Sequence, residues 1–184
     1  MGRIWLISGG RGAGKTTLCA AVIGRAQAAG WDVAGLLSPA VVTGGRKTAI
    51  AALDLRRGER RLLARARAAA AGEQDGESPI RTRAWSFDPA VLAWGDRVLQ
   101  AAVPCDLLVV DELGTLEFER GQGWLSGLAA LDSGRYRQAL AVIRPELLAA
   151  AQARWPAAQL VAVSAVDDRQ ALALAGQILG GLSA

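Results

Sequence analysis

Residues 9–16 read Gly9-Gly10-Arg11-Gly12-Ala13-Gly14-Lys15-Thr16, and this octapeptide matches the pattern G-x-x-x-x-G-K-[S/T] of a phosphate-binding loop. The apolar run from Ile4 to Ile7 precedes the loop and predicts a β-strand, because it is short and contains β-branched and aromatic residues. The segment from Thr17 to Ala29 follows the loop, is rich in alanine and spaces its apolar residues as a helix does. A glycine-rich turn between a strand and a helix is the setting that this motif requires.

The loop binds an anion through its backbone. Glycines let the chain wrap closely, so that successive N–H groups and the positive end of the following helix point at a phosphate. Lys15 is expected to reach the β- and γ-phosphates of a nucleotide, the Thr16 hydroxyl to bind Mg²⁺, and Thr17 to lie nearer the α-phosphate. The alternative is a chance glycine turn, which is disfavoured because Lys15 and Lys47 are the only lysines of the chain. The predicted nucleotide contacts are Gly9, Gly10, Arg11, Gly12, Ala13, Gly14, Lys15, Thr16 and Thr17.

Two carboxylates follow a second apolar run, Leu107 to Val110, which is typical of a buried parallel strand. This is a Walker-B arrangement, in which a strand delivers an acid to the ligand-binding edge of a sheet. Asp111 is expected to hold Mg²⁺ through a coordinated water. Glu112 can face the γ-phosphate, orient a water and accept its proton. The alternative for Glu112 is a strand-end carboxylate that forms an ion pair or caps a helix.

Composition limits the chemistry. With 52% hydrophobic and 21% charged residues, the 184-residue chain has the make-up of a globular protein. It has no histidine, which excludes Ser-His-Asp catalysis and histidine-ligated metals. Cys19 and Cys105 lack metal-site spacing and are expected to be buried thiols. No apolar run is long enough to cross a bilayer and the chain enters a strand at once, so we expect a cytoplasmic protein.

Strands that alternate with helices predict an α/β fold with three layers and a mainly parallel sheet. We expect one domain, residues 1–184, with an inserted β-hairpin region at about residues 39–87. The insert should contain strands at Lys47–Leu55, Arg60–Ala64 and Arg81–Phe87, with a mobile loop or frayed helix at Ala66–Ser78. Later helices are expected at Asp88–Ala102, Gly121–Leu131, Pro145–Ala153 and Asp168–Leu179, and later strands at Ala139–Ile143 and Leu160–Val163.

Phosphoryl transfer also needs a cation on the charge that develops at the γ-phosphate. Arg144 follows a predicted core strand at the correct edge and is the candidate arginine finger. Arg46 and Lys47 on the insert can reach over the phosphates, although a solvated hairpin face is the commoner role for such residues. A dense set of arginines can bind RNA or DNA, but acids lie among them and no aromatic residues interleave them. These arginines are Arg56, Arg57, Arg60, Arg61, Arg65 and Arg67.

The segment Asp111-Glu112-Leu113-Gly114-Thr115-Leu116-Glu117 resembles the D-E-x-G-x-x-E signature of the small P-loop nucleoside-triphosphatases, the thermophile-type enzymes and the human cancer-related nucleoside triphosphatase. The position of the P-loop at the amino terminus is also similar to that family. The resemblance implies a RecA-like P-loop fold with an added catalytic glutamate and slow Mg²⁺-dependent hydrolysis of ATP, GTP and other nucleoside triphosphates. It further implies that Glu117 lines the nucleotide site.

Three functions stay open at this point. A nucleoside-triphosphatase is favoured, because Glu112 suits activation of water. A small-molecule (nucleoside or nucleotide) kinase would use the same P-loop but would need an acceptor hydroxyl. A regulatory ATPase would couple hydrolysis to RNA, DNA or an assembly client, which the basic insert would suit. We expect a monomer whose partners are nucleoside triphosphates, with no membrane association.

Overall fold

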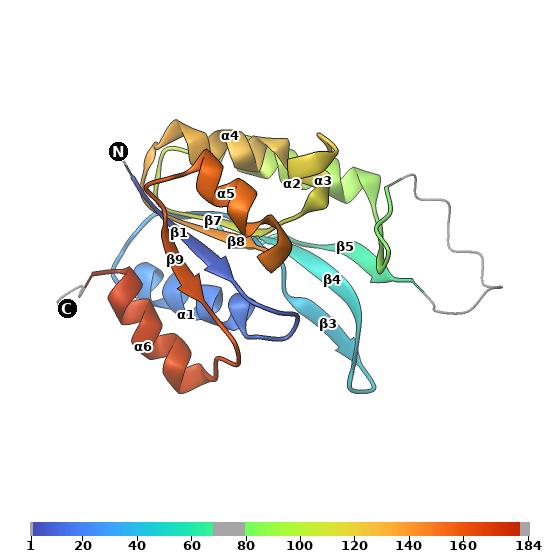
Figure 1. Ribbon diagram of the computed structural model, residues 1–184, viewed down its shortest axis with the longest axis horizontal. Coiled ribbons are helices and arrows are strands. Elements are labelled where there is room, and N and C mark those ends of the chain that lie inside the picture. The colour runs from blue at the N-terminus through green and yellow to red at the C-terminus, as the bar shows by residue number, and fades with distance from the viewer. Residues whose placement is uncertain (1, 68–79, 181–184) are drawn as a thin grey trace.

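The computed structural model describes residues 2–67 and 80–180. Their strands form one sheet in the order β6-β5-β4-β2-β7-β8-β1-β9, with β3 paired to β4. Helices cover both faces of this sheet (Figure 1). The predicted α/β class with three layers and a mainly parallel sheet is confirmed.

The parallel part of the sheet carries the functional edge. Its strands are β1 (Arg3–Ser8), β2 (Val33–Leu37), β7 (Cys105–Leu113), β8 (Tyr136–Ile143) and β9 (Gln159–Ala162). Strand β1 lies between β8 and β9, while β7 lies between β2 and β8. The run Leu107–Val110 is fully buried, as its continuous apolar sequence predicts for a strand covered on both faces.

The insert extends the same sheet instead of standing apart from it. It comprises β3 (Ala40–Thr43), β4 (Arg46–Asp54), β5 (Arg60–Ala66) and β6 (Trp85–Phe87), which pair in antiparallel fashion. Strand β4 joins the core through an antiparallel pairing with β2 at Leu36 and Leu37. Figure 1 shows β3, β4 and β5 projecting beyond the parallel strands. Most of the loop predicted at Ala66–Ser78 lies outside the described residues.

Two helix layers enclose the sheet (Figure 1). Helix α1 (Lys15–Ala28) packs against α6 (Asp168–Ile178) on one face. The other face carries α2 (Pro89–Gln100), α3 (Thr115–Glu119), α4 (Leu125–Ser133), the 3-10 turn η1 (Pro145–Leu147) and α5 (Leu148–Arg154). Among the described residues, no helix combines the length and hydropathy that a bilayer span needs.

The helix predicted at Gly121–Leu131 is wrong at its beginning. The structure has a short helix α3 that ends at Glu119 and a separate helix α4 that begins at Leu125. Gly121 and Gly123 between them adopt φ angles of +60° and +78°, which lie outside the right-handed helical region. The predicted helix runs across this turn, whereas the observed helix α4 begins after the turn, at Leu125.

Within the sheet, we expect the largest loss of stability from a substitution at Gly35 in β2. Its φ is +107°, and a Cβ atom there would lie 2.0 Å from the carbonyl oxygen of Val109 in β7. We expect Gly35→Ala to lower the free energy of unfolding by about 2–5 kcal/mol, because backbone strain and overpacking add together. The measurement is urea unfolding at equilibrium.

Gly24 in α1 provides the matched control. A Cβ atom there meets no heavy atom within 4 Å. We expect Gly24→Ala to raise the free energy of unfolding by about 0.5–1 kcal/mol, because alanine loses less backbone entropy in a helix. Equal unfolding midpoints for the two variants would contradict the close approach of β2 to β7.

Candidate nucleotide-binding site

The phosphate-binding loop connects the end of β1 at Ser8 to the beginning of α1 at Lys15. Gly14 precedes the helix with φ +89°, and a Cβ atom there would lie 2.6 Å from the carbonyl oxygen of Val166. Val166 in turn donates its N–H to the carbonyl of Ala13 at 3.0 Å. Only glycine fits this position, because the backbone is left-handed and closely packed. Packing against the loop between β9 and α6 therefore explains why the motif has a glycine at residue 14.

Lys15 lies across its own loop. Its ammonium donates to the carbonyl oxygens of Gly9 at 2.7 Å and Gly10 at 2.9 Å. The loop therefore holds a cation beside the backbone that is predicted to wrap a phosphate. The contact of Lys15 with the β- and γ-phosphates stays a prediction.

Asp111 lies beside the beginning of α1, as the order of β1, β8 and β7 in the sheet allows. The Thr16 hydroxyl donates to Asp111 Oδ2 at 3.2 Å, and the Ser38 N–H donates to the same oxygen at 3.1 Å. The Ser38 hydroxyl donates to the carbonyl oxygen of Asp111. The two predicted metal ligands, Thr16 and Asp111, are thus brought together from residues 95 apart in sequence.

Burial governs the charge on Asp111, which is 2% exposed. Desolvation raises the pKa of Asp111 to about 7, while the hydrogen bonds from Ser38 and Thr16 oppose this shift. A carboxyl group buried in this way is stabilised as an anion by a neighbouring cation. The Asp111–Thr16 pair therefore offers the oxygen donors that a divalent cation prefers, and its binding of Mg²⁺ stays a prediction.

A metal cage made only of protein groups is not present in the part of the chain that the structure describes. No group of three or more His, Cys, Asp or Glu side chains there has the proximity to hold an ion. Mg²⁺ commonly takes one or two protein ligands and completes its shell with waters and substrate phosphates. The small donor set at Thr16 and Asp111 agrees with that mode of binding.

Glu112 and Arg144 meet at the same edge of the sheet. Arg144 follows β8, and its Nε lies 3.5 Å from Glu112 Oε1. Both side chains are about one-third exposed, at 33% and 30%. The predicted base and the predicted arginine finger are therefore neighbours that form an ion pair. The peptide bond between Asp111 and Glu112 is cis.

Glu117 is a buried residue of helix α3, with 8% of its surface exposed. Its carboxylate accepts hydrogen bonds from the N–H groups of Gly114 at 2.8 Å and Trp124 at 3.0 Å. Burial raises the pKa of Glu117, and the charge of Arg144 acts in the opposite direction. Glu117 therefore ties the loop after Glu112 to the beginning of α4, and its predicted contact with nucleotide stays a prediction.

Two features of this edge were missed from the sequence. Ser38, directly after β2, is not among the predicted site residues, yet its N–H and its hydroxyl both donate hydrogen bonds to Asp111. Trp85 on β6 faces Arg11 of the loop and Lys47 of β4 with the same ring. A serine at the carboxyl end of a core strand was a usable signal for the first feature, whereas the second depends on how the insert folds back.

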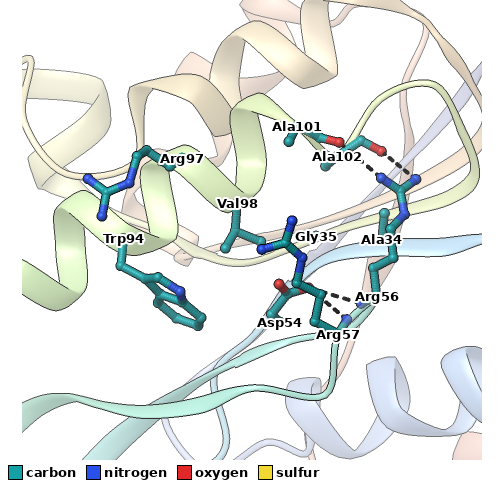
Figure 2. A pocket seen from close by; sticks show the side chains of 10 residues that line it. All are labelled: Ala34, Gly35, Asp54, Arg56, Arg57, Trp94, Arg97, Val98, Ala101 and Ala102. Carbon is teal, nitrogen blue, oxygen red and sulfur yellow. Dashed lines mark hydrogen bonds between the residues drawn. The ribbon is translucent and has the colours of Figure 1, made fainter.

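The arginine-rich turn of the insert makes contacts within the chain. Arg56 bonds to Asp32, with its Nη2 2.7 Å from Oδ2, and to the carbonyls of Ala101, Ala102 and Pro104. Arg61 pairs with Glu59 at 2.7 Å. Arg56 thereby closes one side of a cavity of about 290 Å³ between α2, β2 and β4 (Figure 2). Its ten lining residues are Ala34, Gly35, Asp54, Arg56, Arg57, Trp94, Arg97, Val98, Ala101 and Ala102.

The family of the chain follows from sequence comparison. The model of the family described as NTPase matches residues 4–144, so the chain belongs to this family. This confirms the resemblance that rests on the P-loop and on the segment from Asp111 to Glu117.

Two curated relatives carry the name nucleoside-triphosphatase THEP1. The protein of Methanopyrus kandleri is 30% identical over 114 residues, which are 62% of this chain and 59% of the relative. The protein of Ignicoccus hospitalis is 34% identical over 113 residues, which are 61% of this chain and 60% of the relative. The match thus spans about three-fifths of the length of each relative.

Two solved structures share the fold. The solution structure of a human cancer-related nucleoside triphosphatase matches with a TM-score of 0.67 and 19% identity, covering 97% of this chain and 96% of that one. The crystal structure of THEP1 from Aquifex aeolicus matches with a TM-score of 0.61 and 17% identity, covering 89% and 90%. At this identity the similarity establishes the fold of the chain.

Proposed function

We propose that this protein is a Mg²⁺-dependent nucleoside-triphosphatase that converts ATP, GTP and other nucleoside triphosphates to the diphosphate and phosphate. One observation carries the proposal: Lys15 and Thr16 of the loop lie at the same sheet edge as Asp111 and Glu112, with Thr16 hydrogen-bonded to Asp111. The names of the two curated relatives support the same reaction class.

The loop residues Gly9 to Thr17 bind the triphosphate in this proposal. Backbone N–H groups hold the β-phosphate, and the ammonium of Lys15 exchanges the carbonyls of Gly9 and Gly10 for phosphate oxygens. Thr16 and Asp111 hold Mg²⁺, which supplies charge neutralisation on the β- and γ-phosphates when bound. Ser38 keeps the Asp111 carboxylate in place through its N–H.

Glu112 acts on the attacking water. Its carboxylate is partly exposed and can orient a water in line with the γ-phosphorus and accept its proton. The Nε of Arg144 lies 3.5 Å from that carboxylate and can hold it in position. Because Glu112 can activate a water and needs no acceptor hydroxyl, hydrolysis is favoured over a kinase reaction.

Phosphate release from purified protein tests the proposal. We expect steady release from ATP, GTP, CTP and UTP with Mg²⁺ and no acceptor, and at least a hundredfold less with EDTA, because the phosphates lose their counter-charge. A kinase would release no phosphate until an acceptor hydroxyl is added. No turnover of any nucleoside triphosphate with Mg²⁺ would contradict the proposal.

A further inference from the structure

A tryptophan of the insert contacts two cations, one on the insert and one in the phosphate-binding loop. The ring centroid of Trp85 on β6 lies 5.1 Å from the ammonium of Lys47 on β4 and 5.9 Å from the guanidinium carbon of Arg11 in the loop. Trp85 is 5% exposed, so its position is fixed by packing. The insert and the phosphate-binding loop therefore meet at one aromatic side chain.

The shared ring brings Lys47 close to the loop that is predicted to bind phosphate. Arg11 is the third residue of the loop, between Gly10 and Gly12, and Lys47 shares its ring. The charges of Glu112 and Asp111 on β7, Lys15 of α1 and Arg11 of the loop all act electrostatically on Lys47. Lys15, Asp111 and Glu112 are the residues predicted to act on a bound triphosphate and its metal ion.

Lys47 is exposed, as Arg46 and Thr48 beside it are, and what distinguishes it is the contact of its ammonium with the ring of Trp85. Partial desolvation lowers the pKa of Lys47, and the negative charge of Glu112 acts against this shift. The ring of Trp85 engages the charge of Lys47 through its face and uses none of its three N–H donors. The donors therefore stay available to an anion. Arg46, the preceding residue, lies on the opposite side of β4 because successive strand residues alternate.

We propose that Lys47 is a catalytic residue that contacts the γ-phosphate and stabilises its transition state, with Trp85 as the positioning residue; this inference rests on the proposed hydrolysis. In that step the water oxygen bonds to the γ-phosphorus, and the bond to the bridging oxygen breaks. The electron pair of that bond goes to the diphosphate, and the water proton goes to Glu112. Lys47 transfers no proton and supplies positive charge to the γ-phosphate oxygens as negative charge shifts between them and the leaving diphosphate.

Lys47 is supplied by the insert and not by the parallel strands of the core. Lys47 follows the turn at Gly44 and Gly45 and belongs to β4, which pairs with the core strand β2. The site would thus receive one cation from the core, Lys15, and one from the insert. This division of roles leaves Arg144 as the partner of Glu112.

Kinetics of Lys47→Ala with Arg46→Ala as the matched control test the inference. We expect Lys47→Ala to lower kcat on the order of thirtyfold with KM changed less than about threefold, since a contact made mainly in the transition state affects kcat. Arg46→Ala removes the same charge from the same strand and should keep kcat within about twofold. Lys47→Arg should restore part of the rate and extend activity to higher pH, because arginine keeps its charge where lysine loses it.

Binding of ADP with and without aluminium fluoride separates a catalytic from a structural role. We expect Lys47→Ala to bind ADP as the wild type does and to lose on the order of tenfold affinity for ADP with aluminium fluoride, which mimics the transferring phosphoryl group. Equal losses for both ligands, or wild-type kcat in Lys47→Ala, would overturn the inference. Absence of turnover in the wild type would instead count against the proposed function.

Discussion

Glu112→Gln is expected to lower kcat for nucleoside-triphosphate hydrolysis by at least about a hundredfold, because glutamine cannot accept the proton of the attacking water. Binding of Mg²⁺ with a non-hydrolysable ATP analogue should change little, since Lys15, Thr16 and Asp111 are untouched. Loss of the carboxylate also removes the ion pair with Arg144, whose 3.5 Å separation and partial exposure make its contribution to stability small. Phosphate release and calorimetric binding measure the two effects separately.

Glu119→Gln is the matched control for this prediction. Glu119 ends α3, is exposed, and lies seven residues from Glu112 on the same connection. The same loss of one carboxylate there should leave kcat within about twofold of the wild type. Unchanged turnover in Glu112→Gln would remove Glu112 from the role of general base.

Lys15→Ala is expected to have the largest effect, on the order of a thousandfold in kcat/KM, because it removes the cation nearest to the β- and γ-phosphates. The fold should be retained, since the hydrogen bonds of the Lys15 ammonium within residues 2–67 and 80–180 go to two carbonyls of its own loop, those of Gly9 and Gly10. Circular dichroism checks the fold, and fluorescent-nucleotide titration together with phosphate release checks the function.

Arg25→Ala controls for the loss of one positive charge from the same helix. Arg25 is exposed in the last turn of α1, away from the phosphate-binding loop. Its substitution should leave kcat/KM within about twofold of the wild type. Equal activity of Lys15→Ala and Arg25→Ala would show that the loop does not bind the reacting phosphates.

The parts of the fold that depend on local patterns were predictable from the sequence. Three such features are the glycine spacing of the loop, the apolar run Leu107–Val110 and the beginning of the helix at Asp88, each of which is encoded within a few residues. Asp88 accepts hydrogen bonds from the N–H groups of Ala90 at 2.8 Å and Val91 at 3.3 Å, as its place before Pro89 predicts. Short-range hydrogen bonding and steric restriction determine such features.

The parts that depend on distant pairing were not predictable. The insert was expected as a hairpin, but its continuity with the core rests on the pairing of β4 with β2, which no local pattern encodes. The helix predicted from Gly121 failed because Gly123 lies against Glu117, and a Cβ atom there would be 2.1 Å from Glu117 Oε1. Apolar periodicity alone did not reveal that contact.

The same distinction applies to the site. Lys15, Thr16, Asp111 and Glu112 belong to sequence motifs and lie together at one edge as predicted. Ser38 reaches Asp111 because β2 and β7 are neighbours in the sheet. The stacking of Lys47 and Arg11 on Trp85 likewise requires the insert to fold back toward the loop, and this tertiary arrangement has no motif of its own.

A crystal structure with Mg²⁺ and a non-hydrolysable ATP analogue tests the central claim most directly. We expect the triphosphate to lie in the loop Gly9 to Thr16, with the ammonium of Lys15 moved from the two carbonyls to phosphate oxygens. Mg²⁺ should contact the Thr16 hydroxyl near Asp111, and a water should lie between Glu112 and the γ-phosphate. A nucleotide bound elsewhere, or a γ-phosphate out of reach of both Lys15 and Glu112, would contradict the account.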